Sequence, residues 1–178
     1  MMRGMLVAGV VWLGACSGGL PGSGAHVCTD IGCLDQFTAT VHDANGALPP
    51  GMHALTVTAG TAILRCVFTL PLGTLPGGGT LGLICPAGLQ VQIVPKITCV
   101  TSNTPSAKTQ TCSPVPGALD ELIIVEGKPA SLHVTQTVGD ATYLDETVTP
   151  TYTTSRPNGP GCEPLCSQAS AEWVLAAP

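Results

Sequence analysis

The residues of this chain with the most chemistry to offer are its nine cysteines. One of them, Cys16, lies near the N-terminus, and the other eight are Cys28, Cys33, Cys66, Cys85, Cys99, Cys112, Cys162 and Cys166. An even number of cysteines in an exported chain predicts disulfides, here four. The alternative is a zinc site made of the first two and the last two of the eight, whose spacings are looser than the usual CxxC. We favour disulfides and predict neither a metal nor a cofactor.

The histidines offer a second candidate for metal binding. There are four of them: His26, His42, His53 and His133. His42 and His53 flank a predicted turn at residues 45 and 46, so the two imidazoles and Asp43 would come together if the first two strands paired. Solvated turn residues are the simpler interpretation, and it is the one we favour.

Catalytic arrangements of other kinds find little support in the residue pattern. The chain has no GxSxG motif for a serine nucleophile. The paired carboxylates Asp120-Glu121 and Asp145-Glu146 are sequence neighbours, and neighbours on a strand point to opposite faces. We therefore expect solvated acidic positions, no small-molecule substrate and a chain that is not an enzyme.

The position of Cys16 is explained by the segment that precedes it. Arg3 is followed by an apolar run from Met5 to Ala15, which has the order of a secretory signal and is too short to span a bilayer. The tetrapeptide Leu13-Gly14-Ala15-Cys16 resembles the lipobox of bacterial exported lipoproteins. This resemblance implies cleavage before Cys16 and its lipidation by fatty acyl chains such as palmitate. Because aspartate does not follow Cys16, it also implies sorting to the outer membrane.

These features divide the chain into three parts. Residues 1–15 are the predicted lipoprotein signal peptide, residues 16–27 the lipidated cysteine with a flexible Gly/Ser-rich tether, and residues 28–178 one disulfide-stapled domain. The formal net charge of the whole chain is −5, with no basic patch, so nucleic acid is not an expected partner. The expected partners are the membrane, through the lipid anchor, and another envelope protein.

The elements that must position the cysteines are short strands. In LDQFTATVHD, apolar residues alternate with polar ones, and HALTVTAGTAILRCVFTLP predicts a hairpin whose second strand points Cys66 inward. A second hairpin is predicted about Gly139-Asp140, and Pro95 predicts an edge strand or a bulge. The segment TSNTPSAKTQTCSPVPG is polar throughout, which predicts a loop that a bridge from Cys99 to Cys112 would close. Eight or nine short strands separated by turn signals predict an antiparallel, immunoglobulin-like β-sandwich, with a closed barrel as the alternative.

Strand placement also suggests a disulfide pairing. Cys33 precedes the first predicted strand and Cys166 the last, so their sulfurs meet if those strands lie side by side in parallel. Cys28 would then join Cys162 beside it. A bridge such as Cys66 with Cys85 would close a loop of only about 20 residues and would stabilise the fold less than these two. The alternative is local pairing, Cys28 with Cys33 and Cys162 with Cys166, which would stabilise the fold far less.

Three segments together carry a second resemblance. They are CTDIGCLDQFTATV, LRCVFTLP and PTYTTSRPNGPGCEPLCSQA, and the most specific motif is the PNGPxCxPxC ending. They resemble uncharacterised cysteine-containing lipoproteins of myxobacterial type, which implies an anchored β-rich domain and carries no activity.

The sequence thus predicts a non-enzymatic, membrane-anchored lipoprotein with a structural or binding role at the cell envelope. Two alternatives stay open. One is an accessory subunit of an envelope or secretion complex, and the other is a hydrolase or redox enzyme with an unusual site.

Overall fold

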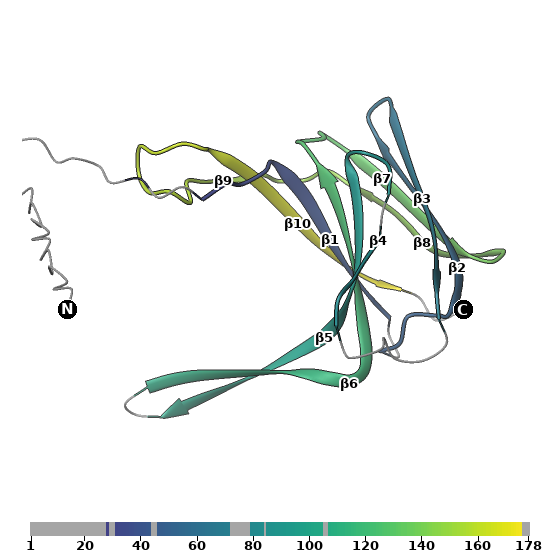
Figure 1. Cartoon of the computed structure of the whole chain (residues 1–178), viewed down its shortest axis with the longest axis horizontal. Helices are drawn as coiled ribbons and strands as arrows, with labels where there is room; N and C mark the ends of the chain where they lie inside the picture. Colours follow the sequence, from purple (N-terminus) through teal and green to yellow (C-terminus); the bar gives the residue numbers. More distant parts are fainter. Residues whose placement is uncertain are drawn as a thin grey trace, which may run out of the picture.

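The structure, a computed structural model, describes residue 28 and residues 31–43, 46–71, 79–83, 85–104 and 107–175. The predicted signal peptide, Cys16 and the tether up to residue 27 lie outside these residues. Every regular element in the described part is a strand, which confirms the expected all-β class (Figure 1). The strands are β1 (Gln36–Asp43), β2 (Gly51–Ala59), β3 (Ala62–Leu70), β4 (Leu81–Leu83), β5 (Leu89–Thr104), β6 (Ala107–Glu126), β7 (Leu132–Val138), β8 (Ala141–Val148), β9 (Thr153–Ser155) and β10 (Cys166–Leu175).

The strands form two sheets. The larger sheet has the order β4-β5-β6-β1-β10-β9, and within it β1 and β10 run parallel while the other neighbours are antiparallel. The smaller sheet has the order β3-β2-β7-β8 and is antiparallel throughout. Both predicted hairpins are confirmed, as β2–β3 and β7–β8. The first two strands do not pair, because β1 and β2 belong to different sheets.

One hydrophobic cluster joins the two sheets. In β1, buried and half-buried positions alternate, so that Phe37, Ala39 and Val41 all point into the core. Residues from β2, β3, β5, β6, β7, β8 and β10 belong to the same cluster. Burying each large apolar side chain contributes roughly 1.5–3 kcal/mol, so this shared core is the main force that holds the sheets together.

All eight cysteines of the domain form bridges, as predicted. Cys28 is joined to Cys162, Cys33 to Cys166, Cys66 to Cys85 and Cys99 to Cys112. The first two, which we call the terminal bridges, hold together the segments that enter the parallel strands β1 and β10. The third bridge links β3 of the smaller sheet to the segment between β4 and β5 of the larger sheet. This pairing rules out both the zinc alternative and the local pairing.

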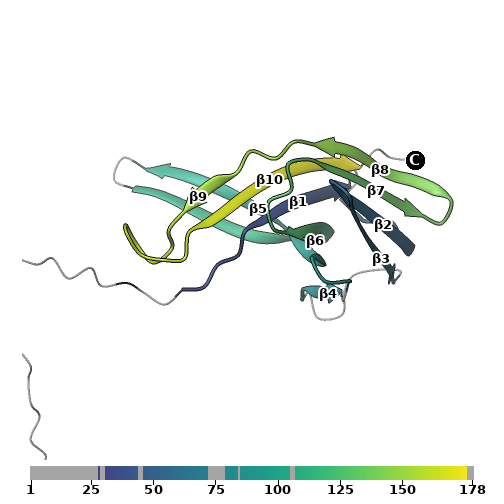
Figure 2. The same ribbon diagram turned by 90° about the horizontal axis from the view of Figure 1, so that it is seen from above.

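The prediction of a polar loop between Cys99 and Cys112 is wrong. Residues 97–104 of β5 and 107–114 of β6 pair with each other beyond the core, and we call this two-stranded extension the arm (Figure 2). Its described side chains are exposed on both faces, including Ile97 at 53% and Val100 at 68%. Because the arm packs on no core, its sequence lacks the alternation by which a strand is normally predicted.

A bulge separates the arm from the core. Pro95 pairs with Leu119 but Ile97 pairs with Pro114, so that Lys96 alone faces the four residues 115–118. Gly117 in this bulge has a φ of 75°, which favours glycine. The prediction of a bulge at Pro95 is confirmed, whereas β5 is not an edge strand, since β4 and β6 lie on either side of it. The extra residues bend the ribbon and direct the arm away from the sheets (Figure 1).

The Cys99–Cys112 bridge is expected to stabilise the arm alone. An isolated two-stranded hairpin is marginally stable in water, so Cys99→Ala/Cys112→Ala should loosen the arm while the core stays folded. Hydrogen exchange should speed up at least about tenfold at residues 98–111, and the urea midpoint of the core should move little. A large shift of the core midpoint would contradict this description of the arm.

Candidate functional site

The two sheets enclose a cluster of polar side chains. Glu121 of β6, Gln136 of β7 and His53 of β2 are exposed by 0%, 1% and 1%, respectively. Their order in space is Glu121, Gln136, His53, so the cluster runs from the larger sheet into the smaller one. The expectation that Glu121 and His53 are solvated is therefore wrong. Both lie in phase with inward-facing apolar neighbours, and this places them in the core.

Hydrogen bonds fix the protonation state of His53. Its Nε2 lies 2.8 Å from the Pro49 carbonyl, which can only accept, so this nitrogen carries the hydrogen. Its Nδ1 lies 3.0 Å from Nε2 of Gln136 and accepts a hydrogen bond from that amide. The ring is thus neutral, and it stacks on Phe68 with a centroid separation of 4.9 Å. Burial lowers the pKa of His53 more than the Pro49 contact raises it.

Glu121 is the least conventional member of the cluster. Its Oε2 accepts a hydrogen bond of 2.9 Å from Nε2 of Gln136, while its Oε1 is buried with no partner among the described residues. Burial raises the pKa of Glu121 to about 7, against which the Gln136 contact acts only in part. Oε1 of Gln136 is likewise buried without a partner. A protonated Glu121 carries the hydroxyl donor that two such acceptor oxygens need, so the neutral acid suits this site.

All three members of the cluster are closed off from solvent. A carboxyl group with no exposed surface cannot meet a substrate in this conformation, so the raised pKa does not mark a general acid. The described residues contain no group of histidine, cysteine and acidic side chains suited to a metal ion.

The other candidate residues do not form one site. Nδ1 of His42 lies 2.7 Å from Oδ1 of Asp120 on the neighbouring strand β6. Asp43 and Asp120 are buried, so the expectation that they are solvated is wrong. Asp145 and Glu146 are exposed as expected, and Asp145 lies 2.7 Å from Nε2 of His133. His42 and His53 each have their own partner, so the structure does not bring them into the metal site considered above.

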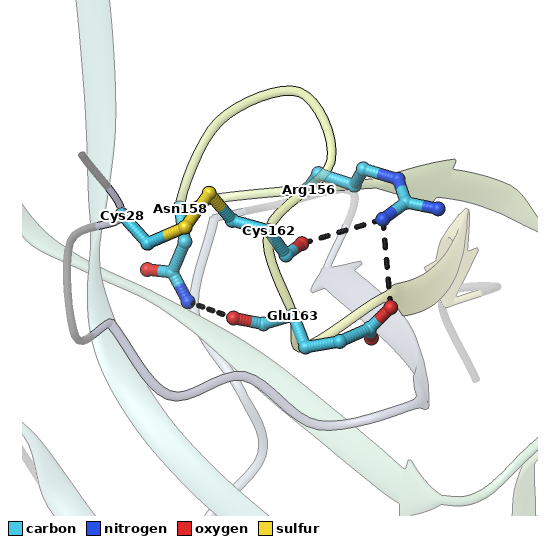
Figure 3. A network of polar contacts seen from close by, with 5 residues as sticks. All are labelled: Cys28, Arg156, Asn158, Cys162 and Glu163. Atoms are coloured by element: carbon cyan, nitrogen blue, oxygen red, sulfur yellow. Dashed lines mark hydrogen bonds and ion pairs between the residues drawn. A yellow bond between two sulfur atoms is a disulfide. The ribbon is translucent and has the colours of Figure 1, made fainter. Parts of the chain in front are cut away.

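A second polar centre lies beside the terminal bridges (Figure 3). Asn158, buried in the PNGPxCxPxC segment, binds both backbone groups of Ile31: Oδ1 accepts from N at 2.7 Å, and Nδ2 donates to O at 3.1 Å. Nδ2 also donates to the Glu163 carbonyl at 2.6 Å. The amide therefore replaces a strand partner for Ile31 and ties it to the loop that carries Cys162.

Asp35 anchors the same end of β1. Its Oδ1 accepts a hydrogen bond of 2.7 Å from the backbone N–H of Ser167 at the start of β10. Nζ of Lys128 lies 3.2 Å from its other oxygen. The hydrogen bond from the Ser167 N–H is the largest cause of the lowered pKa of Asp35, and Lys128 lowers that pKa further. Disulfides, an amide and a carboxylate thus converge where the parallel strands enter the sheet.

Asn158→Ala should destabilise the domain by about 2–4 kcal/mol, because it leaves the two groups of Ile31 and the Glu163 carbonyl without this partner. Asn158→Asp is the matched control, because it keeps an acceptor for the Ile31 N–H but replaces the Nδ2 donor by a carboxylate oxygen that faces the carbonyls of Ile31 and Glu163. Its loss should therefore be at least as large as that of the alanine variant. Urea unfolding without reductant measures both, and an Asn158→Asp variant as stable as the wild type would contradict the role given to Nδ2.

Comparison of the chain with protein-family models, curated proteins and solved structures gives no match. Among the described residues there is no helix with the length and apolar character that a membrane span requires.

Proposed function

We propose that this chain is a lipid-anchored protein of the cell envelope that acts by binding and not by catalysis. Cys16 would carry the lipid anchor after cleavage of residues 1–15, and residues 16–27 would tether the domain to the outer membrane. The two sheets would form an immunoglobulin-like sandwich. The observation that carries the binding role is the arm, a disulfide-closed ribbon that reaches beyond the core with both faces open to solvent.

Several features support binding over catalysis. The buried carboxyl of Glu121 is sealed in the core, and His53 is held neutral by two hydrogen bonds. All cysteines of the domain are bridged, so thiol chemistry would require opening a bridge or an unmodified Cys16. A ribbon closed by a disulfide is suited to recognition, because the bridge limits the order that is lost on binding.

An accessory role in an envelope or secretion complex is the second candidate, and the same arm favours it. In-cell crosslinking distinguishes the accessory role from the general binding role. It compares the wild type with a variant in which a two-residue Asn-Gly turn replaces residues 97–114. If a foreign partner is crosslinked stoichiometrically by the wild type and not by the shortened variant, the accessory role is preferred. If neither protein yields a partner of any kind, the binding role fails.

Lipid attachment has its own test. Cells that express the full chain are fed an alkyne fatty acid, with Cys16→Ser as the matched control. The wild type should be labelled and remain in the membrane fraction, while the variant should lose both properties, because two or three acyl chains are needed for stable anchoring. An unlabelled wild type would overturn the proposal of an anchor.

A further inference from the structure

The arm has two open edges. Beyond the core, residues 97–104 and 107–114 pair only with each other among the described strands, since β4 reaches only residues 91–93 of β5 and β1 only residues 120–126 of β6. Each outer edge of the arm therefore presents backbone N–H and C=O groups without a strand partner. The prolines that guard against edge pairing, Pro95, Pro114 and Pro116, lie at the base of the arm and leave its outer part unguarded.

β8 is an open edge of the smaller sheet. It pairs with β7 alone, and residues 145–147 are exposed on both faces of the strand. The β7–β8 hairpin carries three exposed acidic residues: Asp140, Asp145 and Glu146. Asp145 contacts one titratable group of the neighbouring strand, His133 of β7.

The arm and β8 have opposite charge. The arm contains Lys108 and no acidic residue, and Lys96 lies in the bulge at its base. The arm and this bulge, residues 96–117, have a formal charge of +2 within a chain of net −5, which leaves −7 for the rest. All eleven acidic residues of the chain thus lie outside the arm.

The charges lie at definite places on the two surfaces. Lys108 pairs with Asn103 in the outer part of the arm, and Lys96 lies in the bulge at its base. Asp145 and Glu146 are neighbours on β8, and Asp140 lies in the turn that precedes it.

The arm cannot meet the β8 of its own molecule. Both views show the arm and the β7–β8 hairpin at opposite ends of the long axis (Figures 1 and 2). A contact between them therefore joins two molecules through different surfaces, and such a head-to-tail contact repeats from copy to copy.

We propose that the arm binds a second copy of this chain. In this contact, one edge of the arm pairs with β8 of that copy and adds a strand to its smaller sheet. Backbone hydrogen bonds would give the contact its direction, and the lysines and carboxylates would set its register. Anchored copies would then form rows on the membrane surface. This inference rests on the proposed function only in that a shared anchor concentrates the copies.

The test uses full-length chains purified in detergent, one batch with natural nitrogen and one with ¹⁵N, mixed and treated with a zero-length carbodiimide crosslinker. We expect mixed-isotope peptides that join Lys96 or Lys108 to Asp140, Asp145 or Glu146, and a mass in sedimentation that grows with concentration. Lys96→Glu/Lys108→Glu should weaken association at least about tenfold, as should Asp145→Lys/Glu146→Lys. The chain that carries all four changes should regain it.

Arg65→Glu is the matched control, because Arg65 lies exposed on β3, outside both surfaces, and should leave association unchanged. A chain that stays monomeric at every concentration, or mixed-isotope crosslinks that avoid β8, would overturn the inference. Fatty-acid labelling in the same preparation separates this failure from a failure of the anchor: a labelled monomer overturns only the self-association.

Discussion

Removing both terminal bridges together is expected to unfold the domain, with a loss of about 8 kcal/mol against a typical stability of about 5–15 kcal/mol. The variant is Cys28→Ala/Cys33→Ala/Cys162→Ala/Cys166→Ala. Each bridge closes a loop of more than 130 residues, the separations being 134 and 133. Because closing so long a loop removes much entropy from the unfolded chain, the first bridge to form stabilises the fold by about 5 kcal/mol.

The two terminal bridges are redundant, so their effects should not add. Once one has closed the long loop, the other closes only a short path of roughly 11 residues, worth about 3 kcal/mol. Each single removal should therefore cost about 3 kcal/mol, and the double removal should exceed the sum of the two. Denaturant unfolding followed by fluorescence of the buried Trp173 measures all three variants.

Cys99→Ala/Cys112→Ala is the control for these measurements, because it removes a bridge and leaves the core contacts intact. Single losses that equal half of the double loss would contradict the redundancy. A folded, fully stable quadruple variant would show that the core alone holds the parallel strands together.

Glu121→Gln should be more stable than the wild type above pH 7, by about 3 kcal/mol. The pKa of Glu121 is about 7 in the folded protein, compared with 4.5 for an ordinary glutamate. The folded state therefore binds a proton that the unfolded state has already lost, and this contribution to stability is full below pH 4.5 and disappears as the pH rises through about 7. At about 1.4 kcal/mol per pKa unit, the interval gives the expected size.

Glutamine keeps the neutral form at every pH, and its carbonyl oxygen can accept from Nε2 of Gln136 as Oε2 of Glu121 does. The measurement is the difference in unfolding free energy between variant and wild type from pH 4 to pH 8. His53, whose pKa is lowered, makes stability fall below pH 6.5, but it does so in both proteins and cancels in the difference. A difference that does not change with pH, or a variant less stable than the wild type at pH 8, would contradict the neutral-acid assignment.

How much of this fold the sequence predicts depends on whether a strand faces a core. In β1 and the β2–β3 hairpin, apolar residues alternate because one face is buried, so these strands and the inward direction of Cys66 follow from the pattern. The terminal bridges follow once these strands are parallel neighbours, because Cys33 stands just before β1 and Cys166 is the first residue of β10.

The arm could not be predicted in the same way. Its strands are exposed on both faces, including the apolar Ile97 and Val100, so their pairing depends on each other and on a bridge and not on burial. The polar cluster escapes prediction for a different reason. His53 is in phase with Leu55 and Val57, and Gln136 with Leu132 and Val134, so the signal is present, but the polarity of these residues indicates solvent. The partners that make their burial tolerable come from other strands: Gln136 is the partner of His53 within the smaller sheet, and Glu121 of the opposed sheet is the partner of Gln136.

The most direct test of the account is the intact mass of the protein extracted from the membrane fraction without reductant. The account predicts a chain that begins at Cys16, carries the mass of two or three acyl chains, and lacks two hydrogen atoms for each of four bridges. A mass that corresponds to an uncut or lipid-free chain would contradict the anchor, and a fully reduced mass would contradict the exported, disulfide-closed domain.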